Sequence, residues 1–494
     1  MDLQHSLWLI APEETLSLSG LILLLVAAWA GDKASRLVSI LSVAALAGAA
    51  ALVVPALCAG AAGAGTEAFG GQYRGDAFAA FAKLLIYASA GVTLIVAPAF
   101  FERAKAMRAE FPLLVLFAAL GAGMMVSAGD LLTLYIGLEL NSLSSYVLAA
   151  FLRSDGRSAE AGLKYFVLGA LASGILLFGM SLVYGFTGTT SFPGIRAALT
   201  GELATGALFG VIFVLSGLAF KIAAAPFHMW TPDVYEGAPT PVTTFFATAP
   251  KVAAMALTMR VAVEAFGAQT AAWQQIVIFA ALLSIIIGAL GAIGQGNIKR
   301  LMAYSSINNV GFILIGLAAA TPAGASAMLT YLAIYVAMTV AGFVAILLLR
   351  DASGDQVEAI ADLAGLSKTR PWLALALAMV MFSLAGIPPL FGFWAKFLVF
   401  QAAVEADLIA LAALGIAASV MGAFYYIKIV KVMYFDDAAD LVTGRGDWAH
   451  GVVLALATLF ISPLGYLLTP WLGRLADSAA AAPSARLPIQ PVTR

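Results

Sequence analysis

Apolar stretches of about 20 residues follow one another along almost the whole chain, and no other sequence feature constrains the fold as strongly. A hydrocarbon core about 30 Å thick is crossed by about 20 apolar residues of helix, so each stretch is long enough to span a bilayer. Hydrophobic residues make up 62% of the 494 residues and charged residues 11%, whereas soluble chains are nearer half apolar and a quarter charged. The composition excludes a soluble enzyme, a nucleic-acid-binding protein and a disordered scaffold.

We expect an all-α polytopic membrane protein with about fourteen transmembrane helices, because the stretches lack the alternation of a lipid-facing β-barrel. Lysines and arginines gather in alternate loops, which places both termini in the periplasm if the membrane is a bacterial inner (plasma) membrane. The expected divisions are an N-terminal three-helix segment (1–110), two five-helix groups (111–266 and 273–435), a last helix (450–470) and a disordered tail (476–494).

The chain carries few residues that bind metals or redox cofactors. Its single cysteine, Cys58, excludes an internal disulfide and any multi-cysteine metal or iron–sulfur site. The three histidines argue against a His-rich metal centre, and a net charge of −1 gives no field that would attract a polyanion. We therefore expect no metal site, no cofactor and no nucleic-acid partner.

The basic residues expected within the spans are all lysines: Lys83, Lys164, Lys221, Lys251 and Lys396. An ionisable side chain at membrane depth costs about 2.5–3.5 kcal/mol, so each lysine requires a reason. Arginine stays charged, whereas a desolvated lysine can release its proton. The set therefore favours proton handling, although snorkelling near a helix end is an alternative for Lys83 and for Lys164.

Glu139 is the one carboxylate expected well inside a span, near the bilayer midplane. A carboxylate at that depth is protonated or paired, and a nearby lysine is the natural partner. We hypothesise that Glu139 and Lys221 form a charge pair whose making and breaking tunes Lys251. A pair kept only for packing is the alternative.

Proline interrupts two spans, at Pro226 and at Pro388. Each break combines proline with an aromatic cluster ending in tryptophan and a nearby lysine, Lys221 or Lys396. The two broken spans hold the fourth position in the two five-helix groups, and an odd repeat length inverts one group relative to the other. Matching broken helices in an inverted repeat indicate an ion path, whereas ordinary proline kinks are the alternative. His228 lies inside the first break, as a proton relay or as a packing residue.

Three segments carry a resemblance to a known family: residues 221–253, 297–311 and 386–397. They resemble subunit N of bacterial NADH:quinone oxidoreductase, respiratory complex I, and the resemblance covers essentially the whole chain apart from the tail. The second and third segments are shared with the wider family of antiporter-like subunits, which includes the Mrp cation/proton antiporters. The run Pro-Asp-Val-Tyr-Glu-Gly-Ala-Pro-Thr-Pro-Val at 232–242 is particular to subunit N.

The resemblance implies fourteen helices, with two inverted five-helix repeats and broken seventh and twelfth helices. Lys396 matches the family's lysine on the twelfth helix, and Lys83 has no counterpart. The remaining matches are a glutamate on the fifth helix and lysines on the sixth, seventh and eighth, which correspond here to Glu139, Lys164, Lys221 and Lys251.

The resemblance also implies a function, that of a non-redox subunit that moves protons. NADH, FMN, iron–sulfur clusters and quinone then belong to partner subunits, and the neighbours are the K- and M-type subunits and the lateral helix of the L-type subunit. Protons are expected to pass from Lys164 to Lys251 and, around His228, to Lys396 near the periplasmic exit. An Mrp-type cation/proton antiporter subunit is the main alternative, and a purely structural module is another.

Overall fold

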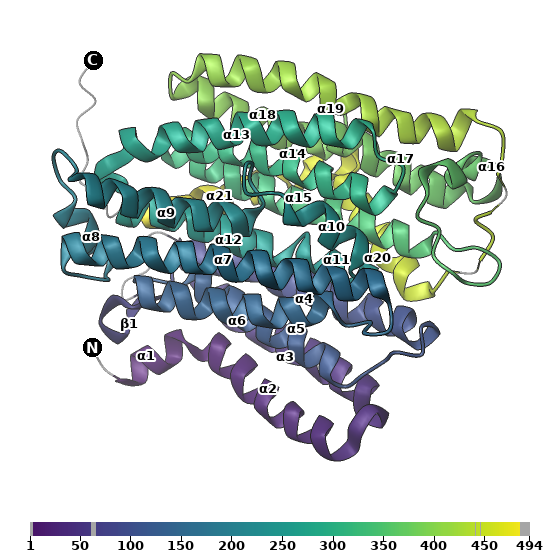
Figure 1. Ribbon diagram of the computed structural model, residues 1–494, viewed down its shortest axis with the longest axis horizontal. Coiled ribbons are helices and arrows are strands. Elements are labelled where there is room, and N and C mark those ends of the chain that lie inside the picture. The colour runs from purple at the N-terminus through teal and green to yellow at the C-terminus, as the bar shows by residue number, and fades with distance from the viewer. Residues whose placement is uncertain (1–2, 61–65, 440, 445, 485–494) are drawn as a thin grey trace.

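The computed structural model describes residues 3–60, 66–439, 441–444 and 446–484. Helices make up nearly all of this part of the chain and lie side by side along the longest axis of the molecule (Figure 1). The described strands, β1 (Glu67–Ala68) and β2 (Tyr73–Arg74), form one short antiparallel pair. The expected all-α architecture is confirmed.

The helices occur along the whole described chain, and the division into the expected groups stays a prediction. The N-terminal helices are α1 (Leu3–Leu9), α2 (Ala11–Ala30), α3 (Ser35–Ala59) and α4 (Ala77–Arg103). The next group comprises α5 (Glu110–Val126), α6 (Leu131–Ala149), α7 (Gly156–Thr187), α8 (Phe192–Ala198), α9 (Thr205–Ile222), α10 (Trp230–Gly237), α11 (Thr240–Phe246), α12 (Ala249–Arg260) and the π-helical turn η4 (Val261–Ala265). The third comprises α13 (Thr270–Ile293), α14 (Ile298–Ala318), α15 (Pro322–Leu348), α16 (Leu366–Thr369), α17 (Pro371–Ala385), α18 (Phe391–Glu405) and α19 (Ile409–Phe435), before α20 (Trp448–Ile461) and α21 (Thr469–Ser484).

Many of these helices are long and apolar enough to cross a membrane. The described chain contains 10 such stretches, or up to 11 if the bent pair of α20 and α21 is one span. One of the ten, Ala11–Ala59, holds both α2 and α3, while α5 and α17 are apolar but shorter. A polytopic membrane protein is therefore confirmed, whereas the number fourteen and the orientation of the termini stay predictions.

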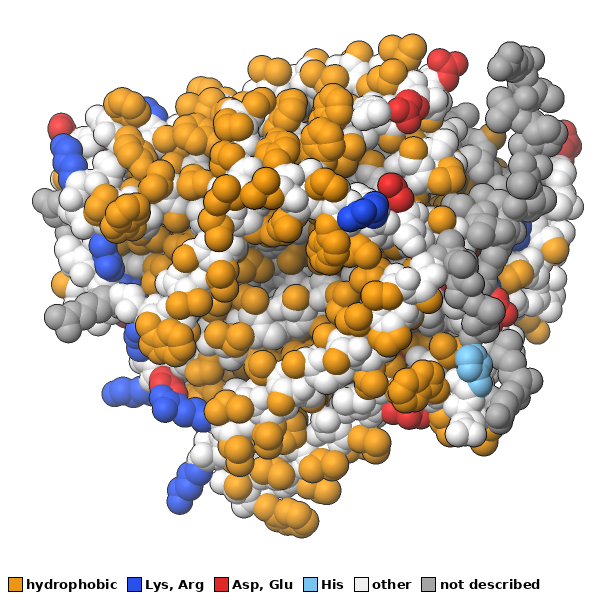
Figure 2. Space-filling model, turned by 180° about the vertical axis from the view of Figure 1, so that it is seen from behind, with side chains coloured by type: hydrophobic (Ala, Val, Ile, Leu, Met, Phe, Trp, Pro, Cys, Tyr) orange, Lys and Arg blue, Asp and Glu red, His pale blue; other side chains and the backbone are white. Residues whose placement is uncertain are grey.

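The protein surrounds three of the spans almost completely. The stretches Thr240–Ala265, Ile298–Ala318 and Pro322–Leu348 are each 94% buried, whereas an outer span such as Gly156–Thr187 is 39% buried. Hydrophobic side chains cover most of the face in Figure 2, and charged ones gather mainly toward its edges. A helix that is apolar on all sides lies in lipid or inside protein, so the outer helices present apolar surface to the bilayer and shield α11, α12, α14 and α15.

One contact recurs in the two five-helix groups. A Cβ on Gly121 of α5 would lie 2.5 Å from the backbone nitrogen of Asn141 on α6, and a Cβ on Gly288 of α13 would lie 2.5 Å from that of Asn308 on α14. Each asparagine Nδ2 donates to a carbonyl of the facing helix, at 2.8 Å in both cases. The same glycine–asparagine contact thus joins the helices of both pairs. This supports the expected repeat, while the inversion stays a prediction.

The end of the chain differs in part from the expected tail. Residues 476–484 continue the helix α21 and are not extended chain. Ala476 and Ala479 are fully buried, and the Asp477 carboxylate accepts a hydrogen bond from Ser326 Oγ on α15 at 2.5 Å. Alanine is the strongest helix former, so an alanine-rich segment becomes helical once a neighbouring helix covers it. The rest of the expected tail, residues 485–494, lies outside the described residues.

Candidate functional site

Glu139 lies on α6, a helix that begins where the Asp130 carboxylate caps the backbone nitrogen of Thr133 at 2.8 Å. The side chain is half-buried, and its Oε1 atom has no hydrogen-bond partner among the described residues. It lies close enough to Lys221 for an electrostatic interaction. Glu139 is therefore an ionisable group in the membrane region that is free to change partners.

Lys221 reaches α6 but binds a different part of it. Its Nζ donates to Ser142 Oγ at 2.7 Å and to Tyr146 Oη at 3.3 Å. The described ion pairs do not join it to Glu139 within 4.0 Å. The expected pair is therefore open in this structure, with the lysine held by hydroxyl groups beside the carboxylate.

The first break separates α9 from α10, as the prolines predicted. Ala223 adopts a left-handed conformation (φ 60°) and ends α9. The freed backbone nitrogen of Ala225 donates to Ser284 Oγ at 2.8 Å, and Trp230 Nε1 donates to the Phe220 carbonyl at 3.0 Å. His228 is half-buried inside the break, and its Nδ1 has no partner among the described residues. The break thus exposes polar backbone that other protein groups satisfy, as unpaired groups at membrane depth require.

Lys251 lies in the first turn of α12, in one of the three protein-surrounded spans. Its side chain is 3% exposed, and its Nζ has no hydrogen-bond partner in the described part of the chain. The ring of Tyr235 lies nearby, with its centroid 5.7 Å from Nζ. An uncompensated charge in such surroundings is costly, and the positive end of the helix dipole adds to that cost. The position therefore suits a lysine that releases its proton.

Lys396 donates a hydrogen bond to backbone that the second helix break leaves unpaired. Gly386 (φ 82°) ends α17, and α18 begins at Phe391. Lys396 Nζ donates to the Ala385 carbonyl at 3.0 Å, which is one of the groups that the break frees, and to Ser419 Oγ at 3.2 Å. The side chain is 7% exposed. Lys396 thus contacts the polar backbone of this break, and its access to water there stays a prediction.

Lys164 is the most exposed of the expected site residues, with a side chain 40% exposed. Its Nζ pairs with Asp233 of α10 at 2.6 Å and with Glu160 at 2.7 Å. Asp233 also accepts from Arg300 at 2.7 Å. Burial raises the pKa of Asp233, but its bonds to Lys164 and Arg300 outweigh burial and hold that pKa below its ordinary value. Lys164 is thus joined by an ion pair to α10, the helix that follows the first break.

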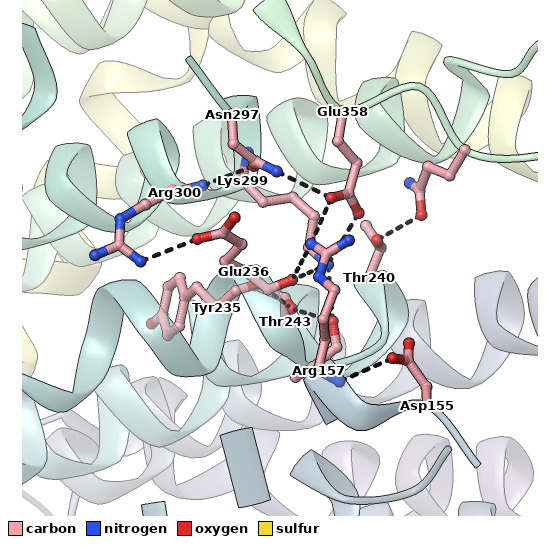
Figure 3. Close-up of polar contacts among 12 residues, drawn as sticks. Asp155, Arg157, Tyr235, Glu236, Thr240, Thr243, Asn297, Lys299, Arg300 and Glu358 are labelled. Carbon is pink, nitrogen blue, oxygen red and sulfur yellow. Dashed lines mark hydrogen bonds and ion pairs between the residues drawn. The ribbon is translucent and has the colours of Figure 1, made fainter. Parts of the chain in front are cut away.

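A polar network at one end of the bundle continues from this point, and the sequence did not single it out (Figure 3). Glu358, in the loop after α15, accepts from Arg157 at 2.7 Å and from Asn297 at 3.0 Å, and lies 3.4 Å from Lys299 Nζ. Lys299 also donates to the Glu236 carbonyl at 2.8 Å. These residues line a cavity of ≈ 780 Å³. The sequence signals for it are limited to Glu236 in the 232–242 run and to Asn297 and Lys299 in the 297–311 segment, to which the sequence assigned no role.

Two further charged clusters correct the expectations made from the sequence. Lys83 does not snorkel: it is 2% exposed, and its Nζ pairs with Glu13 at 2.6 Å. Arg260 is fully buried at the end of α12 and binds Asp76 at 2.8 Å and Glu264 at 2.6 Å, so the buried basic residues are not all lysines. Glu13 and Glu264 are buried carboxylates near the ends of helical segments, in addition to Glu139. The Lys83–Glu13 and Arg260–Asp76 pairs join distant segments, which no local pattern reveals, whereas Glu264 lies only four residues from Arg260.

The structure thus connects some of the expected residues and separates others. Lys221 lies beside the helix of Glu139, and Lys164 binds the segment after the first break. Hydrogen bonds among the described residues do not join His228, Lys251 and Lys396 to one another. Groups of His, Cys, Asp or Glu that could hold a metal ion are not found among the described residues.

Comparisons with known proteins agree with this geometry. The family model described as NADH:quinone oxidoreductase/Mrp antiporter, TM, matches residues 128–422, which is more than half of the chain. The chain belongs to this family. NADH-quinone oxidoreductase subunit N of Erythrobacter litoralis is 71% identical over 482 residues, which are 98% of this chain and 99% of that protein. The expected resemblance to subunit N is therefore confirmed.

Solved structures share the fold. A chain of respiratory complex I from Thermus thermophilus with bound aureothin matches with a TM-score of 0.79 and 34% identity, over 94% of this chain and 99% of that one. A chain of the Mrp complex from Dietzia matches with a TM-score of 0.80 and 24% identity, over 97% of each chain. The second likeness shows the fold alone, so the sequence relatives separate the two expected functions.

Proposed function

We propose that this chain is the proton-translocating, non-redox membrane subunit of a bacterial NADH:quinone oxidoreductase. It would couple quinone reduction elsewhere in the complex to proton transfer through buried lysine, glutamate and water. The observation that carries the proposal is Lys251, a buried lysine without a hydrogen-bond partner in a span that protein surrounds. A scaffold has no reason to bear the insertion cost of such a lysine, whereas a proton carrier requires a group that can be neutral or charged.

The open Glu139–Lys221 pair supplies the variable charge in this proposal. In the present arrangement the Lys221 ammonium is held by Ser142 and Tyr146. When Lys221 turns to Glu139, the two charges compensate each other. When it turns away, its positive charge raises the cost of a proton on Lys251 and favours proton release there.

Uptake from the cytoplasm is assigned to the end of the bundle that holds the polar network. Lys164, Asp233 and Arg300 form a chain of ion pairs at the start of α10. Tyr235 follows two residues later on α10, and its ring faces Lys251. The ≈ 780 Å³ cavity admits water to the same segment. In this proposal, water molecules between Tyr235 and the ion pairs complete a proton path from Lys164 to Lys251.

Release is assigned to the second break. Protons from Lys251 would pass through water around His228 to Lys396, which we place nearest the periplasmic exit. The partners in this proposal are the K- and M-type subunits, the lateral helix of the L-type subunit and the inner-membrane lipids, with both termini in the periplasm. NADH, FMN, iron–sulfur clusters and quinone then lie in other subunits.

The test is Lys251→Arg, compared with Lys251→Ala, in inverted membrane vesicles. Arginine keeps the charge but does not release its proton, so we expect it to lower NADH-driven proton uptake nearly as much as alanine does. Lys428→Arg is the matched control, because Lys428 is an exposed lysine on α19 and the change keeps its charge. Full turnover with arginine at position 251 would exclude titration of this lysine.

The same vesicles test the antiporter alternative. Proton flux that depends on a Na⁺ gradient, without NADH, would support an Mrp-type cation/proton antiporter. Flux that requires NADH and copurification with quinone-reductase subunits would support the proposal.

A further inference from the structure

Glu13, Tyr73 and Lys83 form a closed triangle of hydrogen bonds in the N-terminal part of the bundle. Lys83 Nζ lies 2.6 Å from Glu13 Oε1 and donates to Tyr73 Oη at 2.7 Å, while Tyr73 Oη donates to Glu13 Oε2 at 2.6 Å. The side chains are 3%, 4% and 2% exposed. An acid, a base and a hydroxyl group that bridges them are thus within proton-transfer distance of one another.

The local structure holds this triangle in place. Glu13 lies in the first turn of α2, just after Pro12, and the Asp76 carboxylate caps α4 by accepting from the backbone nitrogen of Ala79 at 2.9 Å. Lys83 is seven residues beyond this cap, so it lies on the same face of α4 two turns along. On α5, Gly123 leaves the space that the carboxylate occupies, since a Cβ there would lie 3.0 Å from Glu13 Oε1.

The triangle borders a cavity. Tyr73, Lys83 and Asp76 line a space of ≈ 210 Å³ with Trp8 and Pro12. Its walls belong to α1, α2, α3, β2 and α4, and α1 and β1 lie at the same end of the bundle (Figure 1). Most of the lining is apolar, but a space of this size has room for water beside its polar groups, which include His5, Tyr73, Asp76 and Lys83. Lys83 and Tyr73, which line the cavity, therefore have a route for protons toward the end of the bundle where α1 lies.

Other charged and titratable groups surround the triangle on every side. Asp76 links it to Arg260, at 2.8 Å, and through Arg260 to the end of α12, the helix that carries Lys251. The groups that face it are His5 on α1, Glu67 on β1, Arg74 on β2, Asp76 and Tyr87 on α4, Arg260 on α12 and Glu264 on η4. Burial and the Glu13 carboxylate raise the pKa of Tyr73 well above its ordinary value. The phenol is therefore a hydrogen-bond donor to Glu13 and an acceptor from Lys83, placed to relay a proton between them.

We propose that Glu13, Tyr73 and Lys83 form a second proton-exchange site of this chain, which opens through the ≈ 210 Å³ cavity to the end of the bundle where α1 lies. The inference rests on the proposed proton translocation. The Lys83 ammonium gives a proton to the Tyr73 oxygen as that phenol gives its own proton to Glu13, which leaves a neutral amine and a neutral carboxylic acid. Glu13 then releases its proton through the Tyr73 hydroxyl, which lines the cavity, to cavity water, and Lys83 takes one up from the same water.

Lys83→Arg in the assembled complex separates this role from a structural one. Arginine keeps the ion pair with Glu13 but does not release its proton. We expect NADH-driven proton flux in proteoliposomes to fall at least about a hundredfold, the low side of what a positioned proton-transfer group contributes. A purely structural pair predicts the wild-type flux, and that flux at normal complex content would overturn the proposal.

Glu13→Gln keeps the inference falsifiable if arginine does not fit. Glutamine removes the acid with little change in shape, so we expect the same fall in flux, together with loss of a deuterium-sensitive carboxylic-acid band from the infrared difference spectrum. An unchanged flux and spectrum would overturn the site. Lys251→Met in the same preparations distinguishes the two proposals: if it pumps normally, the proposed function fails, and if it alone abolishes pumping, only this inference fails.

Discussion

Ser142→Ala tests how Lys221 and Glu139 work together. The substitution removes the acceptor that lies 2.7 Å from Lys221 Nζ and leaves Tyr146 at 3.3 Å. Glu139 precedes Ser142 by three residues on α6, which is about one helical turn. Because the lysine loses its shorter contact, we expect it to turn toward the carboxylate.

The size of the effect follows from that single contact. A hydrogen bond to a charged group contributes about 1.5–3 kcal/mol, and about 1.36 kcal/mol corresponds to a tenfold change in population. The hydroxyl-bound form of Lys221 should therefore fall about 10- to 150-fold relative to the form paired with Glu139. Since the proposed cycle requires both forms, we expect proton flux to fall at least about tenfold.

The assay is NADH-driven proton flux and quinone reduction in the same vesicles, normalised to assembled complex. Ser144→Ala is the matched control. Ser144 and Ser142 each donate a hydrogen bond to a backbone carbonyl four residues earlier on α6, Ser144 to Leu140 at 2.9 Å and Ser142 to Leu138 at 2.6 Å. The control reproduces the change in the helix without the change at the lysine. Wild-type flux in Ser142→Ala would refute the two-position account of Lys221.

Three further outcomes follow from the same geometry. Glu139→Gln should lower proton pumping and coupled quinone reduction together while the complex assembles, and near-normal pumping would contradict the charge pair. Lys396→Ala should impair pumping and Lys396→Glu should retain part of it, so an equal loss in both would remove titration at this position from the path. Burial raises the pKa of Glu358, but Lys299 and Arg157 hold it below its ordinary value, so its stabilisation is present above the unfolded-state pKa and is lost as pH falls through the folded-state pKa. The difference in thermal stability between wild type and Glu358→Gln should thus be largest at neutral pH and close in acid, and a difference independent of pH would reject this.

Apolar length and proline placement predicted the features that depend on neighbouring residues. The helices, the two breaks and the burial of Lys251 and Lys396 follow from runs of local sequence, because a helix and its interruption are decided within a few turns. The lysine that donates to the Ala385 carbonyl lies on the next helix segment, so this contact was within reach of the same reasoning.

Contacts between distant segments were not predictable in this way. Arg260 sits near a span end and resembles a loop arginine until Asp76, from another part of the chain, is placed against it. Lys83 resembles a snorkelling residue until Glu13 is brought to it. The hydroxyl contact of Lys221 was missed for a different reason: opposite charge favours Glu139 as its partner, but the hydroxyl group of Ser142 competes for the same ammonium at short range.

The hydrogen bonds of Lys396 affect how fast its ammonium group can release a proton. Its partners are a backbone carbonyl and a hydroxyl group, and the described ion pairs do not include it. The C-terminal end of α17 carries a partial negative charge of about half an elementary charge. When Lys396 loses its proton, no full negative charge is therefore left without a partner. A site that attracts a proton only weakly exchanges that proton quickly and does not hold it for long. In the proposed path, Lys396 would therefore exchange its proton quickly, and charge would be stored at Glu139 and not at Lys396.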